Sequence, residues 1–207
     1  MSLADFEALV LSQRPADKAW EPVTDYSFEA RKAIEGDHPR LILEVFQPRL
    51  ILDVGCGFKT LVNLLNGTAF LNGASHMIAR GADVSNASAD INFDISSYGL
   101  FAPSESDLVI CREVLEHLTV MQIRKAITNL CALSSKFVYV TTRFHQNPTS
   151  LLDVATSDDL DPTHITMLNQ DFLRLLFVLE GFKRRADLEE RIDWQHKGRC
   201  LVYERAV

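Results

Sequence analysis

Short apolar runs alternate with longer amphipathic stretches over residues 49–205. Between residues 120 and 133, apolar side chains recur every three or four positions, as Val120, Ile123 and Ile127 do, and this spacing is typical of a helix packed on one face. A second strongly apolar helix is expected over residues 169–179. The runs that predict strands cover residues 50–54, 77–84, 108–111, 137–142, 182–188 and 199–204.

Strands that alternate with helices predict right-handed βαβ units, and therefore a mainly parallel sheet with helices on both faces. The last two runs have no helical stretch between them, so we expect them to pair as an antiparallel ribbon. Residues 1–47 instead read as three amphipathic helices, over 3–10, 27–34 and 40–46. We therefore divide the chain into an N-terminal helical extension or lid (1–47) and a main domain (48–207).

Composition narrows the function classes. The 207 residues carry 21 Lys+Arg against 28 Asp+Glu, a formal net charge of −7, which argues against a dedicated nucleic-acid binder. No apolar run approaches the roughly 18 residues of a membrane span, and the start has no secretory signal pattern. The four cysteines are far apart and form no C-x-x-C pair. This predicts no disulfide framework, no metal site and a reducing, cytoplasmic compartment.

The most informative stretch is the apolar run that ends in Gly55-Cys56-Gly57. A parallel strand that turns through glycines into a helix predicts a ligand-binding crevice at the strand's carboxyl end, and a tight strand-to-helix turn is the alternative. The third glycine of the dinucleotide pattern G-x-G-x-x-G is absent. Tyr139 is also followed four residues later by Arg143, where hydride chemistry would use a lysine. Both departures disfavour a nicotinamide cofactor.

Taken with the rest of the chain, these residues carry a family resemblance. The sequence DVGCG at 53–57 resembles motif I of the class I S-adenosylmethionine-dependent methyltransferase superfamily. The sequence SDLVICREVLEHL at 106–118 is similar to the "FDLVxxxxVLEHL" segment of its small-molecule branch (type 11/23-like). The tail from PTHI at 162–165 to Gly181-Phe182 resembles the family's "H…L…GF" pattern. The resemblance covers residues 49–205 and implies a doubly wound, Rossmann-like sheet of seven strands, the last one antiparallel.

The resemblance also implies which residues bind S-adenosylmethionine. Asp83, at the end of the second strand, would accept both ribose hydroxyls with its two oxygens, a helix N-cap being the alternative. Asp94 would accept the adenine amino group beside the apolar Ile95, with a surface turn as the alternative. Asp53 would support the glycine loop and the amino-acid end of the cofactor. The full predicted set is Asp53, Gly55, Cys56, Gly57, Asp83, Val84, Asp94, Ile95, Cys111 and Arg112.

Two features depart from the family pattern. Lys59 stands near the place of a further glycine and leaves a bulkier, charged loop. Asp53 and Asp83 are also unusually far apart in sequence. We assign the extra length to an inserted loop over residues 66–76.

The implied reaction is methyl transfer to an oxygen, nitrogen or carbon atom by in-line displacement. Positioning supplies much of such a rate, and a base is needed only where the nucleophile must lose a proton. The candidate bases are His117, His145 and His164, whose unperturbed pKa near 6.5 suits the task. Packing or capping is the alternative role for each histidine. Arg143 is a candidate for an anionic substrate group, or is simply solvated.

The acceptor is expected to be a small molecule. No [D/N]-P-P-[aromatic] motif follows the fourth strand, and no Pro-Cys pair is present for attack on a pyrimidine ring. The alternative function is a non-catalytic cofactor-binding protein with the same fold, suggested by the altered Gly57-Phe58-Lys59 loop. The sequence does not predict the oligomeric state.

Overall fold

The computed structural model describes residues 28–74, 76–84, 88–97, 106–145, 152–153, 164–195 and 197–206, together with Ala4 and Ala8. The helix predicted over residues 3–10 therefore lies, apart from those two positions, outside the described residues. The first two residues of the tail motif PTHI and the side chain of His145 also lie outside the described residues.

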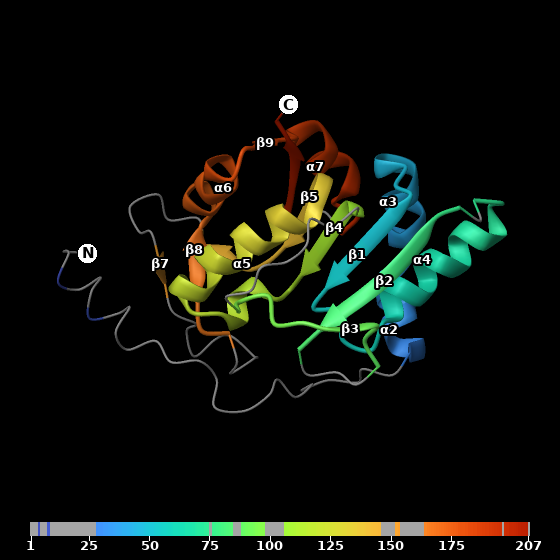
Figure 1. The fold of residues 1–207 in the computed structure, drawn as a ribbon, viewed down its shortest axis with the longest axis horizontal. Coiled ribbons are helices and arrows are strands. Elements are labelled where there is room, and N and C mark those ends of the chain that lie inside the picture. Colours follow the sequence, from blue (N-terminus) through green and yellow to red (C-terminus); the bar gives the residue numbers. More distant parts are fainter. Residues whose placement is uncertain are drawn as a thin grey trace.

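The larger of two sheets has seven strands, in the order β3-β2-β1-β4-β5-β10-β9 (Figure 1). β1, β2, β3, β4 and β5 are mutually parallel, and β10 is antiparallel to both of its neighbours. This confirms the expected fold class. The strands are β1 (Leu50–Val54), β2 (Ile78–Asp83), β3 (Ile91–Asn92), β4 (Ser106–Arg112), β5 (Ser134–Thr141), β9 (Phe182–Arg184) and β10 (Cys200–Arg205).

Helices cover both faces of the sheet (Figure 1). On one face, α3 (His38–Phe46), α4 (Thr60–Leu71) and α7 (Ala186–Ile192) bury their apolar sides in a common core. On the other face, α5 (Val120–Leu133) and α6 (Gln170–Leu179) do the same. α5 begins with a capping box in which Thr119 and Gln122 each bind the other's backbone N–H. The helix α2 (Phe28–Glu35) precedes α3, and a short 3-10 turn, η1 (Leu115–His117), follows β4.

A second, small sheet was not predicted. It contains β6 (Phe144–His145), β7 (Leu152–Asp153) and β8 (Met167–Asn169), in the order β6-β8-β7. Because β6 follows β5 closely and β8 leads into α6, this sheet lies next to the carboxyl end of the main sheet. None of the described helices is long and apolar enough to cross a membrane.

The loop predicted over residues 66–76 is wrong over its first half. α4 continues to Leu71, so the extra length between Asp53 and Asp83 is mostly helix. The Asn66-Gly67 pair favours a break in isolation, but the continued helix buries Ala69 in the core. Asn66 also anchors the helix to β2, because its side-chain amide donates to the Ala79 carbonyl (3.0 Å) and accepts from the Ala79 N–H (2.9 Å).

The prediction for the end of the chain is partly wrong. β9 and β10 pair antiparallel as expected, but β9 ends at Arg184 and the helix α7 separates the two strands. Leu188 and Ile192 explain the difference, since both are buried on the core face of α7. The seven-residue helix is too short for its periodicity to distinguish it from a strand end.

Candidate functional site

The strand order locates the site. The order in which the chain adds strands to the sheet reverses between β1 and β4, because α4 follows β1 on one face and α5 follows β4 on the other. In open α/β sheets, ligands bind outside the carboxyl ends of the strands at such a switch point. Here the switch point is flanked by Gly55–Gly57 after β1 and by residues 112–114 at the end of β4.

The glycine loop is fixed to the end of β2. The backbone N–H groups of Gly55 and Cys56 both donate to the Ala82 carbonyl (2.8 and 3.2 Å). The Gly57 N–H donates to Oδ2 of Asp83 (3.0 Å), a carboxylate that is only 9% exposed. Asp83 and the glycine loop, 26 residues apart in sequence, are therefore direct neighbours.

The structure constrains Gly55 and Gly57 of the loop in different ways. Gly55 has φ +76°, and a Cβ there would lie 2.3 Å from Cγ2 of Val114, so the close approach of the loop after β4 requires glycine. Gly57 has φ +51°, and a Cβ there would meet no atom within 4 Å of the described protein. The space beside Gly57 is therefore open, next to the buried carboxylate of Asp83.

Asp53 lies in the buried carboxyl half of β1 and is 4% exposed. Burial raises its pKa to about 7, although the charge of Arg112 acts in the opposite direction. Near neutral pH this carboxyl group can therefore hold a proton behind the glycine loop.

Lys59 lies along β2. Its backbone is left-handed (φ +60°) at the start of α4. A Cβ built on Gly81 would lie 3.2 Å from Lys59 Cγ, which shows how closely the lysine stem covers that strand. The ammonium group pairs with Oδ1 of Asp90 at 2.5 Å, and Oδ2 of Asp90 accepts from the Gly81 N–H (2.8 Å). The bulkier loop is thus accommodated by a carboxylate beyond β2.

Two substitutions of Lys59 separate its charge from its backbone. Lys59→Ala should lower the free energy of unfolding by about 0.5–1 kcal/mol, since it removes a partly exposed ion pair and keeps an unfavourable left-handed residue. Lys59→Gly should be neutral or slightly stabilising, because the relief of the left-handed backbone offsets the lost pair. Urea denaturation of both variants measures this, and an equal loss in both would contradict the backbone contribution.

The remaining predicted cofactor residues are placed as follows. Oδ1 of Asp94 accepts from the N–H and the hydroxyl of Ser96 (2.8 and 2.7 Å), so this carboxylate stabilises its own turn. Ile95 is 6% exposed, and its carbonyl accepts from the Asn129 side chain of α5 (2.7 Å). Cys111 is fully buried in the core, whereas Val84 is exposed beside Asp83. The Asp94 geometry matches the surface-turn alternative.

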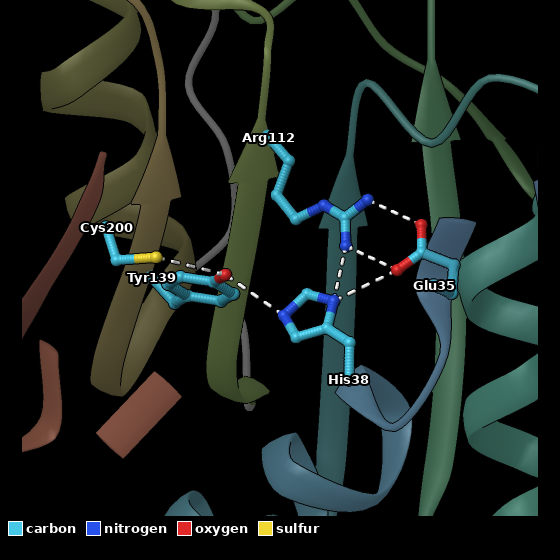
Figure 2. A network of polar contacts seen from close by, with 5 residues as sticks. All are labelled: Glu35, His38, Arg112, Tyr139 and Cys200. Atoms are coloured by element: carbon cyan, nitrogen blue, oxygen red, sulfur yellow. Dashed lines mark hydrogen bonds and ion pairs between the residues drawn. The ribbon is translucent and has the colours of Figure 1, made fainter. Parts of the chain in front are cut away.

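The side chain of Arg112 belongs to a buried network (Figure 2). Its guanidinium binds both carboxylate oxygens of Glu35, at 2.6 and 2.8 Å, and lies 2.6 Å from Nδ1 of His38. Arg112 thus ties the end of α2 and the start of α3 to the end of β4. Because the side chain is engaged in this network, only the backbone of Arg112 is available to line the switch point. Glu35 and His38 were not predicted from the sequence, because nothing local marks partners that lie 77 and 74 residues from Arg112.

The network continues across the sheet. Nε2 of His38 lies 3.0 Å from the Tyr139 hydroxyl, which lies 3.7 Å from the Cys200 sulfur, and the ring of Trp194 stacks on His38. Burial lowers the pKa of His38 to about 4. Burial alone would raise the pKa of Glu35, but hydrogen bonds from His38 and Arg112 outweigh it and lower the pKa to about 2.

His38 should make the fold sensitive to acid. The folded state keeps His38 neutral down to about pH 4, while the unfolded chain protonates it near pH 6.5. The contribution of His38 to the free energy of unfolding is therefore fully present above pH 6.5 and is lost as the pH falls toward 4. We expect the stability of the wild type, relative to His38→Gln, to fall by about 3 kcal/mol over that range. Urea denaturation at both pH values measures the difference, and a constant difference would exclude a neutral His38.

Two of the candidate bases come together. The rings of His117 and His164 lie 4.8 Å apart between centroids. The segment that carries His164 is held because the N–H groups of Ile165 and Thr166 donate to the Glu116 carbonyl (2.8 and 3.2 Å). Arg143 is partly buried just beyond β5, on the same carboxyl side of the sheet. The described residues contain no group of three His, Cys, Asp or Glu side chains suited to a metal ion.

Several solved structures are similar to this chain, although no protein-family model and no curated sequence matches it. An O-methyltransferase family protein from Burkholderia thailandensis is similar over 86% of this chain and 58% of its own, with 12% identity and a TM-score of 0.58. The sugar N-methyltransferase KedS8 from Streptoalloteichus sp. is similar over 94% and 99% of the two chains, with 13% identity and a TM-score of 0.58.

Magnesium protoporphyrin IX methyltransferase (ChlM) from Synechocystis, solved with bound SAH (S-adenosylhomocysteine), covers 99% of this chain and 95% of its own. The identity is 16% and the TM-score 0.56. The chain spans little more than half the length of the Burkholderia protein but nearly all of the other two. Together with the strand order, these likenesses show that the chain has the class I methyltransferase fold.

Proposed function

We propose that the chain is an S-adenosylmethionine-dependent methyltransferase that acts on a small-molecule acceptor. The observation that carries the proposal is the contact between the Gly57 N–H and the Asp83 carboxylate at the switch point, beside open space. The similar structures support it, because they include methyltransferases of sugars and of a porphyrin, some with the cofactor or its product bound. The assignment to the small-molecule VLEHL branch is part of this proposal.

The residues present fit the adenosyl group. Asp83 supplies a carboxylate for the ribose hydroxyls, and the missing Cβ at Gly57 leaves room for the ligand against the backbone. When bound, the cofactor supplies a methyl group on a sulfonium sulfur. The sulfur is a good leaving group because it departs as a neutral thioether. The protein's own contribution is to hold the acceptor in line and to exclude water. We assign completion of the acceptor pocket to the N-terminal residues 1–47, of which α2 and α3 are fixed to the sheet by Glu35 and His38.

Calorimetric titration with S-adenosylmethionine, S-adenosylhomocysteine and NAD tests the proposal. We expect micromolar binding of both sulfur compounds and none of NAD. If neither sulfur compound binds, the proposed function is wrong and the chain shares only the fold of the methyltransferases. Turnover with any acceptor would dismiss the alternative of a binding protein without catalysis. That alternative rested on the altered loop, where Lys59 is now accounted for by Asp90.

Asp83→Asn is the sharpest variant for cofactor binding. An asparagine oxygen can still accept from Gly57, so the loop should persist, but one acceptor for a ribose hydroxyl and the negative charge are lost. We expect the affinity for S-adenosylhomocysteine to fall about 10–100-fold, or roughly 1.4–2.7 kcal/mol. Asp187→Asn, an exposed aspartate on α7, is the matched control and should bind as the wild type does. Equal affinity in the two variants would remove Asp83 from the site.

A further inference from the structure

The segment that returns to the sheet after Asp83 borders the proposed cofactor site. It ends in β3, whose two residues, Ile91 and Asn92, pair with the end of β2 and are both exposed. An edge strand of this length makes few ladder hydrogen bonds and buries little surface. The segment therefore needs further contacts to keep its place beside Asp83.

Asp90 supplies such contacts. Its N–H donates to the Gly81 carbonyl (2.9 Å), and its Oδ2 accepts from the Gly81 N–H (2.8 Å). Its Oδ1 is paired with the Lys59 ammonium group at 2.5 Å. One carboxylate thus joins the returning segment both to β2 and to the residue two positions after Gly57.

Lys59 is held firmly in a backbone conformation that disfavours lysine. Its left-handed φ of +60° is costly for a residue with a Cβ. Its N–H donates to the Cys56 carbonyl (2.9 Å), which ties it to the glycine loop. Its side chain is 19% exposed and that of Asp90 is 36% exposed, so the solvent screens their ion pair only in part. A residue kept in an unfavourable conformation by its surroundings points to a functional role.

We propose that Lys59 is a positioning residue for the cofactor, because its ion pair with Asp90 straps residues 88–92 to the glycine loop. This inference rests on the proposed function and adds that the affinity for the cofactor depends on the Lys59–Asp90 strap. The strapped segment supports Asp83, whose carbonyl accepts from the Phe93 N–H (3.1 Å) while its carboxylate accepts from Gly57. Ordering these parts before the ligand arrives lowers the entropy lost on binding.

Titration of the full chain with S-adenosylhomocysteine tests the strap. We expect Lys59→Met and Asp90→Asn each to weaken binding about two- to fivefold, the range for loss of a partly exposed ion pair. The double variant should lose no more than either single variant, because all three lack the same pair. Lys59→Arg keeps the charge and should retain most of the affinity. Lys183→Met is the matched control, since Lys183 pairs with Glu204 at the far edge of the sheet, and it should bind as the wild type does.

Salt supplies a second readout that a merely structural lysine would not change. The difference in affinity between the wild type and Lys59→Met should shrink at about 1 M salt, where the Debye length is about 3 Å. Unchanged or tighter binding by Lys59→Met would overturn the inference. So would losses that multiply in the double variant, because Lys59 and Asp90 would then act independently.

Hydrogen exchange of the Gly81 amide keeps the strap and the proposed function distinguishable, because it needs no cofactor. This N–H donates to Asp90, so Lys59→Met should speed its exchange about two- to fivefold, and Lys183→Met should not. If Gly81 responds in this way but the wild type does not bind S-adenosylhomocysteine, the methyltransferase function is wrong and the positioning role falls with it. If the wild type binds and Gly81 does not respond, only the strap is wrong.

Discussion

Replacing Arg112 with methionine should lower the free energy of unfolding by about 3–5 kcal/mol, the usual cost of removing one partner from a buried ion pair. Glu35 is 3% exposed and keeps its charge only because Arg112 and His38 surround it. Without the guanidinium, Glu35 must stay charged without compensation or take up a proton. Urea denaturation of the protein without cofactor measures the loss.

Two controls make the Arg112 result specific. The double variant Glu35→Leu/Arg112→Met should recover much of the stability, because an apolar pair can replace a buried ion pair at little cost. Arg40→Met removes an arginine whose partners are exposed, and it should cost no more than about 1 kcal/mol. A loss of less than about 1 kcal/mol in Arg112→Met would mean that Glu35 does not depend on this cation.

The elements that were predicted correctly from the sequence are those that depend on residues close together along the chain. Apolar runs and glycine punctuation located β1, β2, β4 and β5, since each buries residues that are consecutive or nearly so. The end of α4 and the whole of α7 were missed for the opposite reason. Their helical state depends on burying Ala69, Leu188 and Ile192 against elements distant in sequence, and tertiary packing of this kind overrides local propensity.

The site shows the same division. The glycine loop follows from its motif, and the resemblance drew attention to Asp83, which the structure places against Gly57. The link between Arg112 and Glu35 joins β4 to a helix ahead of β1, and no periodicity encodes such a pairing.

Gly55→Ala should lower the free energy of unfolding by about 2–5 kcal/mol. A left-handed backbone costs a residue with a Cβ roughly 1–2 kcal/mol, and overpacking adds about 1–3 kcal/mol. Overpacking is expected because the new Cβ would lie 2.3 Å from Cγ2 of Val114. Gly55 follows β1 and Val114 follows β4, so the strain affects the segments on both sides of the switch point. We therefore expect cofactor binding to be lost as well.

Gly57→Ala is the matched control, because it places the same methyl group on a left-handed backbone (φ +51°) with nothing within 4 Å. Its stability cost should be limited to the backbone cost of about 1–2 kcal/mol, while under the proposed function the methyl group still obstructs the cofactor. The double variant Gly55→Ala/Val114→Ala should recover the steric part of the loss and leave the backbone part. Urea denaturation and titration with S-adenosylhomocysteine separate the two effects. If Gly55→Ala proves as mild as Gly57→Ala, the contact with Val114 does not constrain the loop.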